Sequence, residues 1–104
     1  MSIVKAQNVN HPDHRQNLKE EKYTVIREAM LATLPGSTSD GMPFLEMEEK
    51  VAVYLADKSV PKEMFPKPGS VRWYCKSVQL DLEAKGIIER LPKRTPIHLR
   101  KTDV

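Results

Sequence analysis

The stretch VRWYCKSVQLDLEAKGIIERLPKRTPIHLR, Val71–Arg100, carries the strongest structural pattern in the chain. Its apolar residues first recur at intervals of three and four, the spacing of one helix face, at Val71, Tyr74, Cys75, Val78 and Leu82. Gly86 follows, and glycine easily takes the left-handed backbone conformation that ends helices. Two short alternating segments come next, and Pro92 and Pro96 confine the turn between them to an exposed tip. The stretch predicts a helix over residues 70–85 and then a β-hairpin with strands over 87–91 and 97–100.

Two further helices are predicted before this stretch. The first runs from about Asn17 until Pro35-Gly36 stops it, and its apolar face is formed by Tyr23, Ile26, Met30 and Leu34. The second starts at about Pro43, and its apolar residues are Phe44, Met47, Val51, Tyr54 and Leu55. Residues 57–69, with three prolines, form a loop longer than the usual connection of about two to eight residues between helices. Ser70 is a suitable N-cap for the third helix.

The composition is typical of one globular domain. Of 104 residues, 39% are hydrophobic and 30% are charged. Residues 1–16 carry little periodicity and are expected to form an arm before a domain over residues 17–104. The sequence has no apolar run of about 18 residues, and its N-terminal segment lacks the apolar stretch of a secretion signal. We therefore expect a soluble, cytoplasmic protein with no membrane partner.

Positive charge is concentrated toward the C-terminal end. The net charge is +3, but residues 1–52 hold 6 basic and 8 acidic residues, whereas residues 53–104 hold 11 and 6. Residues 90–101 include no acid and five basic residues, Arg90, Lys93, Arg94, Arg100 and Lys101. A basic hairpin on a nearly balanced domain indicates a local contact with a polyanion. The alternative is that these charges only discourage aggregation at the edge of a solvated strand pair.

The order helix, helix, helix, β-hairpin, over about residues 17–101, resembles the winged helix-turn-helix domain. The segment LEAKGIIER, Leu82–Arg90, is similar to the exit of the recognition helix in winged-helix transcriptional regulators. The chain is also similar to the N-terminal domain of Mrr-type restriction enzymes, in which a tryptophan lies early in the same helix, as Trp73 does here. The long loop over residues 57–69 departs from the family pattern.

The resemblance implies an α+β fold that binds duplex DNA. In DNA-binding members of the family, the third helix enters the major groove, and the hairpin, called the wing, touches an adjacent groove or the backbone. By position, the resemblance implicates helix residues Arg72, Lys76 and Ser77 and wing residues Lys93 and Arg94. Arg100 and Lys101 complete the basic segment of the hairpin and are further candidates for DNA contact.

The outward face of the third helix leaves a second function open. Opposite the apolar stripe it presents Trp73, Lys76, Ser77 and Leu80, with Arg72 at the margin. Two large apolar groups in an exposed position need covering, either by Val60, Met64 and Phe65 of the loop or by a partner chain. In the second case the domain would be a winged-helix interaction module or a homodimer, with a candidate interface of Met64, Phe65, Trp73 and Leu80.

We favour duplex DNA over a protein partner, because the basic residues cluster where the resemblance places the contact. The acidic group Glu46, Glu48 and Glu49 would repel a duplex if it lies on the same side of the domain. A position at a helix N-terminus also explains these acids, since the helix dipole favours them there.

No catalytic or metal-binding pattern stands out. Cys75, the only cysteine, lies on the apolar face of the third helix and is expected to pack as a small hydrophobe. His11, Asp13 and His14 are close in sequence, but no third well-placed ligand accompanies the two histidines, so a solvated arm is favoured over a metal site. The sequence has no Gly-rich phosphate loop and no Ser-His-Asp pattern. We expect a protein that is not an enzyme and needs neither cofactor nor metal.

Overall fold

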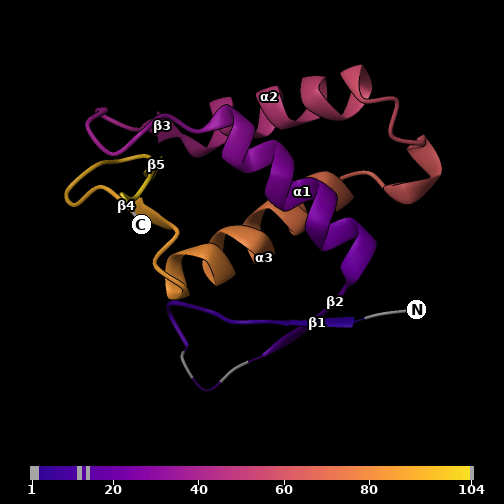
Figure 1. Cartoon of the computed structure of the whole chain (residues 1–104), viewed down its shortest axis with the longest axis horizontal. Helices are drawn as coiled ribbons and strands as arrows, with labels where there is room; N and C mark the ends of the chain where they lie inside the picture. The colour runs from indigo at the N-terminus through magenta and orange to yellow at the C-terminus, as the bar shows by residue number, and fades with distance from the viewer. Residues whose placement is uncertain (1–2, 12, 14, 104) are drawn as a thin grey trace.

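Three helices and two small antiparallel sheets make up an α+β fold (Figure 1). The computed structural model describes residues 3–11, 13 and 15–103. Its helices are α1, Glu20–Thr33, α2, Phe44–Asp57, and α3, Ser70–Ala84, and the 3-10 turn η1, Lys62–Met64, lies between the last two. All three helices were predicted. No helix within the described ranges is both long and apolar enough to cross a membrane.

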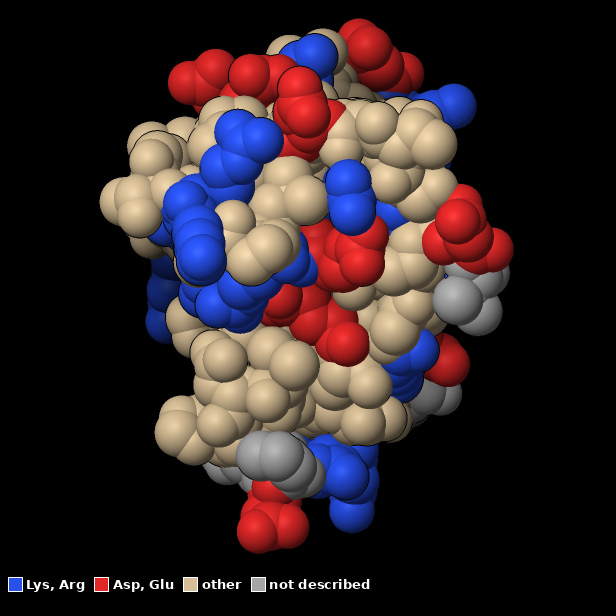
Figure 2. Space-filling model, turned by 90° about the vertical axis from the view of Figure 1, so that its left-hand side faces the viewer, with Lys and Arg blue, Asp and Glu red and all other residues tan. Residues whose placement is uncertain are grey.

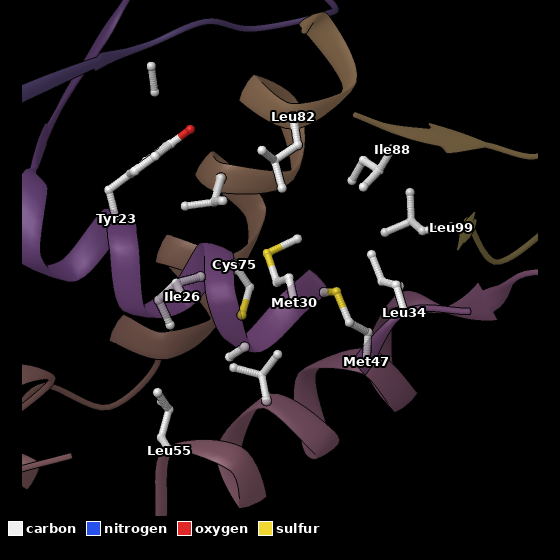
Figure 3. Close-up of a cluster of buried hydrophobic side chains, with 14 of the residues drawn as sticks. Tyr23, Ile26, Met30, Leu34, Met47, Leu55, Cys75, Leu82, Ile88 and Leu99 are labelled. Atoms are coloured by element: carbon white, nitrogen blue, oxygen red, sulfur yellow. The ribbon is translucent and has the colours of Figure 1, made fainter. Parts of the chain in front are cut away.

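The apolar stripes of the three helices meet in one core (Figure 3). Its members on α1, α2 and α3 are fully or almost fully buried, and they include Tyr23, Ile26, Met30, Met47, Val51, Leu55, Cys75, Val78 and Leu82. These are residues that the periodicity of three and four predicts to face inward. Ile88 and Leu99 extend the core toward the C-terminal strands, so the helices and the second sheet share one interior.

The predicted hairpin is confirmed, but it belongs to a three-stranded sheet. Strands β4, Ile88–Arg90, and β5, His98–Lys101, pair with each other, and β3, Met42–Pro43, adds a third strand in the order β3-β5-β4. The backbone N–H of Phe44, the first residue of α2, donates to the carbonyl oxygen of Ile97 at 3.1 Å. The start of α2 is therefore tied to the base of the hairpin.

The expected irregular arm is in part a second β-hairpin. Strand β1, Ile3–Ala6, pairs with β2, Gln16–Lys19, and α1 starts at Glu20 rather than at Asn17. Ala6 and Leu18 are fully buried, which gives this hairpin its contact with the core. Residues 1–2, 12 and 14 lie outside the described residues, so the structure describes the group of His11, Asp13 and His14 only in part.

A buried carboxylate fixes the N-terminal hairpin to α3. Asp81 has no exposed surface, and its Oδ1 accepts the backbone N–H of Gln7 at 2.7 Å. Its Oδ2 accepts the hydroxyl of Tyr23 and lies 2.8 Å from Nζ of Lys85. Burial and the hydrogen bond to Asp81 raise the pKa of Tyr23. Burial alone would lower the pKa of Lys85, but its bonds to Asp81 and Tyr23 outweigh that effect, and this pKa is also raised.

The start of α3 differs from the prediction. Ser70 was expected to be the N-cap, but it is the first helical residue, and Gly69 precedes it with φ 80°. The side-chain oxygen of Ser70 is buried and makes no hydrogen bond to any described residue. Glycine occupies the cap because the chain enters α3 through a left-handed conformation, which a residue with a Cβ adopts only with strain.

Replacing Tyr23 by Phe should destabilise the protein by about 1–2 kcal/mol at neutral pH, because the buried oxygen of Asp81 loses a donor. It should also flatten the loss of stability at high pH. Since the folded-state pKa values of Tyr23 and Lys85 are raised, the unfolded chain loses these protons first, and stability falls as pH rises above about 10. Urea unfolding at a series of pH values measures both effects.

Tyr54→Phe is the control for this experiment, since the ring of Tyr54 lies under Lys58 and not beside a buried carboxylate. If the free energy of unfolding falls equally steeply with pH above about 10 in wild type and Tyr23→Phe, the ionisation of Tyr23 does not contribute to this loss of stability.

Replacing Gly41 by Ala should destabilise the fold more than replacing Gly86 by Ala. Both glycines have positive φ, 87° and 74°, so each substitution should cost about 1–2 kcal/mol in backbone strain. A Cβ at Gly41 would also lie 2.5 Å from Cδ1 of Leu91 and 3.1 Å from Cβ of His98, whereas a Cβ at Gly86 meets nothing within 4 Å. Denaturant midpoints of the two variants give the comparison. Equal losses would mean that the hairpin does not approach Gly41 as closely as described.

Candidate nucleic-acid interface

The outward face of α3 lies between two other elements. On one flank is the start of α2, where Nζ of Lys76 lies 5.5 Å from the ring centroid of Phe44. On the other flank is the N-terminal hairpin. A hollow of about 220 Å³, here called the Trp73 hollow, is lined by residues of α3 and of that hairpin, Gln7, Asn8, Gln16, Trp73, Lys76, Ser77 and Leu80. The structure therefore brings the predicted helix residues Lys76 and Ser77 to one surface.

Arg72 lies on the α2 side of this face. Its side chain is 61% exposed, and its Nε lies 2.8 Å from Oε1 of Glu48 on α2. Glu48 is 22% exposed, so the cation of this pair faces solvent and its attraction is screened by salt, while the acid is largely covered. The guanidinium of Arg72 is therefore accessible to a competing anion.

The tip of the β4–β5 hairpin carries two more accessible cations. Lys93 adopts φ 59° and is exposed at the turn. Arg94 is 47% exposed, and its NH2 group lies 4.0 Å from the carboxylate of Asp40, which is almost fully exposed. Figure 2, which views the hairpin end of the molecule, shows Lys and Arg side chains gathered on one side and acidic side chains beside them.

The remaining basic residues of the hairpin bind other parts of the protein. Arg100 lies 2.6 Å from Glu89 on the paired strand and donates to the carbonyl oxygen of Ser39 at 2.8 Å. Nζ of Lys101 donates to the carbonyl oxygen of Leu31 at 3.1 Å. The basic segment of the sequence is thus divided into an accessible tip and a strand pair with intramolecular partners.

Arg90 and Glu83 join β4 to α3. Nε and Nη2 of Arg90 donate to the two carboxylate oxygens of Glu83 at 2.7 and 2.9 Å. These hydrogen bonds raise the pKa of Arg90 against the opposing effect of burial. The side chain of Glu83 is only 5% exposed, so its charge is largely compensated inside the protein.

The start of α2 connects the two groups of cations. The ring of Phe44 lies beneath Lys76 of α3, and its backbone N–H binds Ile97 at the base of the hairpin. The basic end of α3 and the hairpin therefore lie on adjoining parts of the molecule. Two of the three acids at the start of α2 have cationic neighbours, since Glu48 contacts Arg72 and Glu46 lies 3.8 Å from Lys50.

Of the two alternatives for Trp73, the one in which Val60, Met64 and Phe65 of the loop cover it is wrong. Trp73 is 47% exposed, and its ring meets Tyr74 edge-on at 5.2 Å between centroids. Phe65 of the loop packs against Tyr74 as well, at 5.6 Å. Tyr74 is one position further round the helix, on the side where it packs against the core and where Nζ of Lys22 on α1 lies 5.7 Å from its ring centroid.

The loop, which lies at the opposite end of the molecule from the β4–β5 hairpin (Figure 1), also borders an apolar cavity of about 560 Å³. The cavity is lined by Ala52, Leu55, Ala56, Val60, Pro61, Lys62, Glu63, Phe65, Pro66 and Val71. The four predicted interface residues are consequently split. Phe65 lines this apolar cavity, and the partly buried Met64 precedes Phe65 in the chain. Trp73 and Leu80 line the Trp73 hollow instead.

Cys75 is fully buried, as its place on the apolar face predicts. Burial, with a smaller effect of the charge on Glu48, raises the pKa of its thiol to about 12. A thiol in this state is a poor nucleophile and a poor metal ligand, because both roles require the thiolate.

One family profile matches residues 3–99 of the chain, and its description is family of unknown function (DUF6958). Comparison with curated proteins gives no match, and neither does comparison with solved structures.

The emission of Trp73, the only tryptophan, should be that of a solvent-exposed indole and should not change on dilution. The reason is that about half of the Trp73 surface is exposed. Steady-state fluorescence with acrylamide quenching, measured over a wide range of protein concentrations, checks this. A blue-shifted emission that becomes red-shifted on dilution would mean that a second chain covers Trp73.

Proposed function

The chain belongs to the DUF6958 family, whose function is unknown, and we propose that it is a cytoplasmic, non-catalytic DNA-binding protein of the winged helix-turn-helix type. We propose that it acts as a transcriptional regulator and binds DNA with α3 in the major groove and the β4–β5 hairpin as a wing on the adjacent backbone.

The order of the elements supports the winged-helix assignment. Three helices precede the β4–β5 hairpin, and α3 leads directly into β4 through Gly86. Strand β3, just before α2, pairs with β5 and anchors the hairpin beside the helices. A wing held in this way keeps a fixed position relative to α3, which contact with two neighbouring grooves requires.

The observation that carries the proposal is the meeting of α3 and the hairpin at Phe44. Lys76 lies over the ring of this residue, and Ile97 at the hairpin base accepts its backbone N–H. A polyanion on this side would meet Arg72, Lys76 and Ser77 from α3 and then Lys93 and Arg94 from the tip. The Arg94–Asp40 pair is exposed, so phosphate oxygens can replace it at small cost, whereas in the Arg72–Glu48 pair the guanidinium of Arg72 is accessible but Glu48 is only 22% exposed.

The acidic residues near this surface oppose binding less than their number indicates. Glu83 is compensated by the two hydrogen bonds from Arg90, and Glu89 by Arg100. In our proposal Arg100 and Lys101 support the wing and do not contact DNA, because both already bind other parts of the protein.

Binding to a random-sequence duplex should depend strongly on salt. Four to five phosphate contacts give a slope of log K against log salt of about −4. The double variant Lys93→Ala with Arg94→Ala should reduce the slope to about −2 and weaken binding whatever the sequence, since each lost contact removes about 0.9 from the slope. Fluorescence anisotropy of a labelled duplex at several salt concentrations measures both quantities.

The matched control is Lys58→Ala with Lys62→Ala, which removes the same charge near the loop at the other end of α2. It should leave the slope and the affinity nearly unchanged. If the wing variant retains wild-type affinity, the wing is not part of the site. If both double variants weaken binding equally, the contact depends on net charge and not on this surface.

A second candidate function, a protein-interaction module, is favoured by the apolar cavity beside the loop. Val53 follows the cavity-lining residue Ala52 in α2 and is 59% exposed, and an apolar cavity with further exposed apolar groups on the same helix is typical of a binding surface. If the protein binds no duplex even at low salt, sedimentation velocity of wild type and Val53→Asp becomes the decisive comparison. Self-association that Val53→Asp abolishes would support the interaction module, and two monomeric proteins would reject a homodimer through this face.

A further inference from the structure

We propose that the Trp73 hollow binds a single unstacked nucleobase of the bound nucleic acid. This inference rests on the proposed DNA-binding function and identifies a ligand that the helix and the wing do not account for.

Trp73 provides an exposed aromatic surface on which a base can stack. About half of its surface is exposed, and its ring meets Tyr74 edge-on. The Trp73 hollow lies on one side of this residue, and a second hollow, lined by Lys67, Pro68, Gly69, Ser70 and Tyr74, also borders it. Stacking of a base on an exposed aromatic ring contributes about 1–3 kcal/mol and tolerates any base, because every base has a π-face.

The size of the Trp73 hollow fits one planar ring system. Its volume of about 220 Å³ is below the range of about 300–1,000 Å³ typical of drug-sized ligand sites. The hollow cannot therefore hold an extended ligand, but one base with its sugar at the entrance suits it.

Three amide side chains supply the means to read the edge of a base. Gln7, Asn8 and Gln16 all line the hollow, and each primary amide presents a donor beside an acceptor, the pattern that pairs with adenine N6 and N7. Within residues 3–11, 13 and 15–103, the side-chain amides of Gln7 and Gln16 make no hydrogen bond. The Asn8 side-chain oxygen accepts the N–H of Asn10 at 2.9 Å, which leaves its NH2 group available.

The backbone positions of these amides are fixed although their side chains are not. The N–H of Gln7 donates to buried Asp81 of α3, and Gln16 is paired with Ala6 in the ladder of β1 and β2. Both residues are thereby held beside α3, at the same hollow as Trp73. Positions held this way reduce the ordering entropy that a ligand must overcome.

Lys76 connects this hollow with the proposed phosphate contacts. It lines the hollow and also lies over Phe44 at the start of α2. A strand whose phosphate is near Lys76 therefore has a base within reach of Trp73. Extruding a base from a duplex costs a few kcal/mol, and least where the base is already unpaired. The site should consequently prefer a duplex with an unpaired adenine to a fully paired one.

The test compares three duplexes of equal length and flanking sequence. One is fully paired, one has a single bulged adenine at its centre, and one has an abasic residue in the place of that adenine. We expect the bulged adenine to bind about tenfold more tightly than the other two, which corresponds to about 1.4 kcal/mol. It should also quench the emission of Trp73 most strongly, since only it can stack on the ring.

Two variants separate stacking from edge recognition, with anisotropy of labelled DNA as the readout. Trp73→Ala should lose the tenfold preference while retaining affinity for the paired duplex. Gln16→Ala should bind bulged adenine and bulged thymine equally, whereas wild type prefers adenine. Leu45→Ala, an exposed apolar residue outside the hollow, is the control and should retain every preference.

Equal affinity and equal quenching for all three duplexes would overturn the base site and leave the proposed DNA binding intact. Equal affinity and equal quenching for the abasic and the bulged-adenine duplexes would also overturn the base site, because the adenine base would then make no contact with the protein. Absence of binding to any of the three would overturn both proposals.

Discussion

The buried carboxylate of Asp81 is the interaction on which the relative positions of the N-terminal hairpin, α1 and α3 depend. A charge with no exposed surface is tolerated only when donors surround it, and Asp81 has three, the N–H of Gln7, the hydroxyl of Tyr23 and the ammonium of Lys85. Each donor comes from a different segment of the chain. Replacing the carboxylate by an apolar group would leave the N–H and the hydroxyl without a partner in the interior, so the hairpin has one favourable position against α3.

In the β4–β5 hairpin, ion pairs and hydrogen bonds within the protein likewise separate the basic residues of the strands from those of the tip. Glu83 and Glu89 hold Arg90 and Arg100 against the sheet, and the carbonyl oxygen of Leu31 holds Lys101. These contacts tie the hairpin to α1 and α3 and partly cancel its charge. Only the tip, with Lys93 and Arg94, projects its charge away from the protein. The net charge of a segment therefore overstates what a ligand can use, because intramolecular pairs take up the cations nearest the core.

The sequence predicts the parts of this fold that follow from local patterns. The three helices show an apolar periodicity of three to four and the β4–β5 hairpin one of two, and Gly86 follows the end of α3 with the positive φ expected of glycine there.

The parts that local patterns do not predict depend on contacts between distant residues. Strand β3 is only two residues long, and its pairing with β5 joins positions far apart in sequence, so no local signal marks it. The N-terminal hairpin has few apolar residues, and its stability depends on Asp81, whose burial cannot be read from a helix face. Trp73 remains exposed because Phe65 packs on Tyr74, a choice between adjacent residues that periodicity cannot resolve.

These constraints also determine how α3 can meet a duplex. The helix is bordered by the start of α2 on one flank and by the N-terminal hairpin on the other, so its outward face is narrower than that of an isolated helix. A narrow face admits few direct contacts with stacked bases. The border that causes this restriction also places the amides of Gln7 and Gln16 beside Trp73. If the proposed DNA binding holds, the N-terminal hairpin that narrows the outward face of α3 also forms the proposed base site, and specificity would come more from one extruded base than from a row of groove contacts.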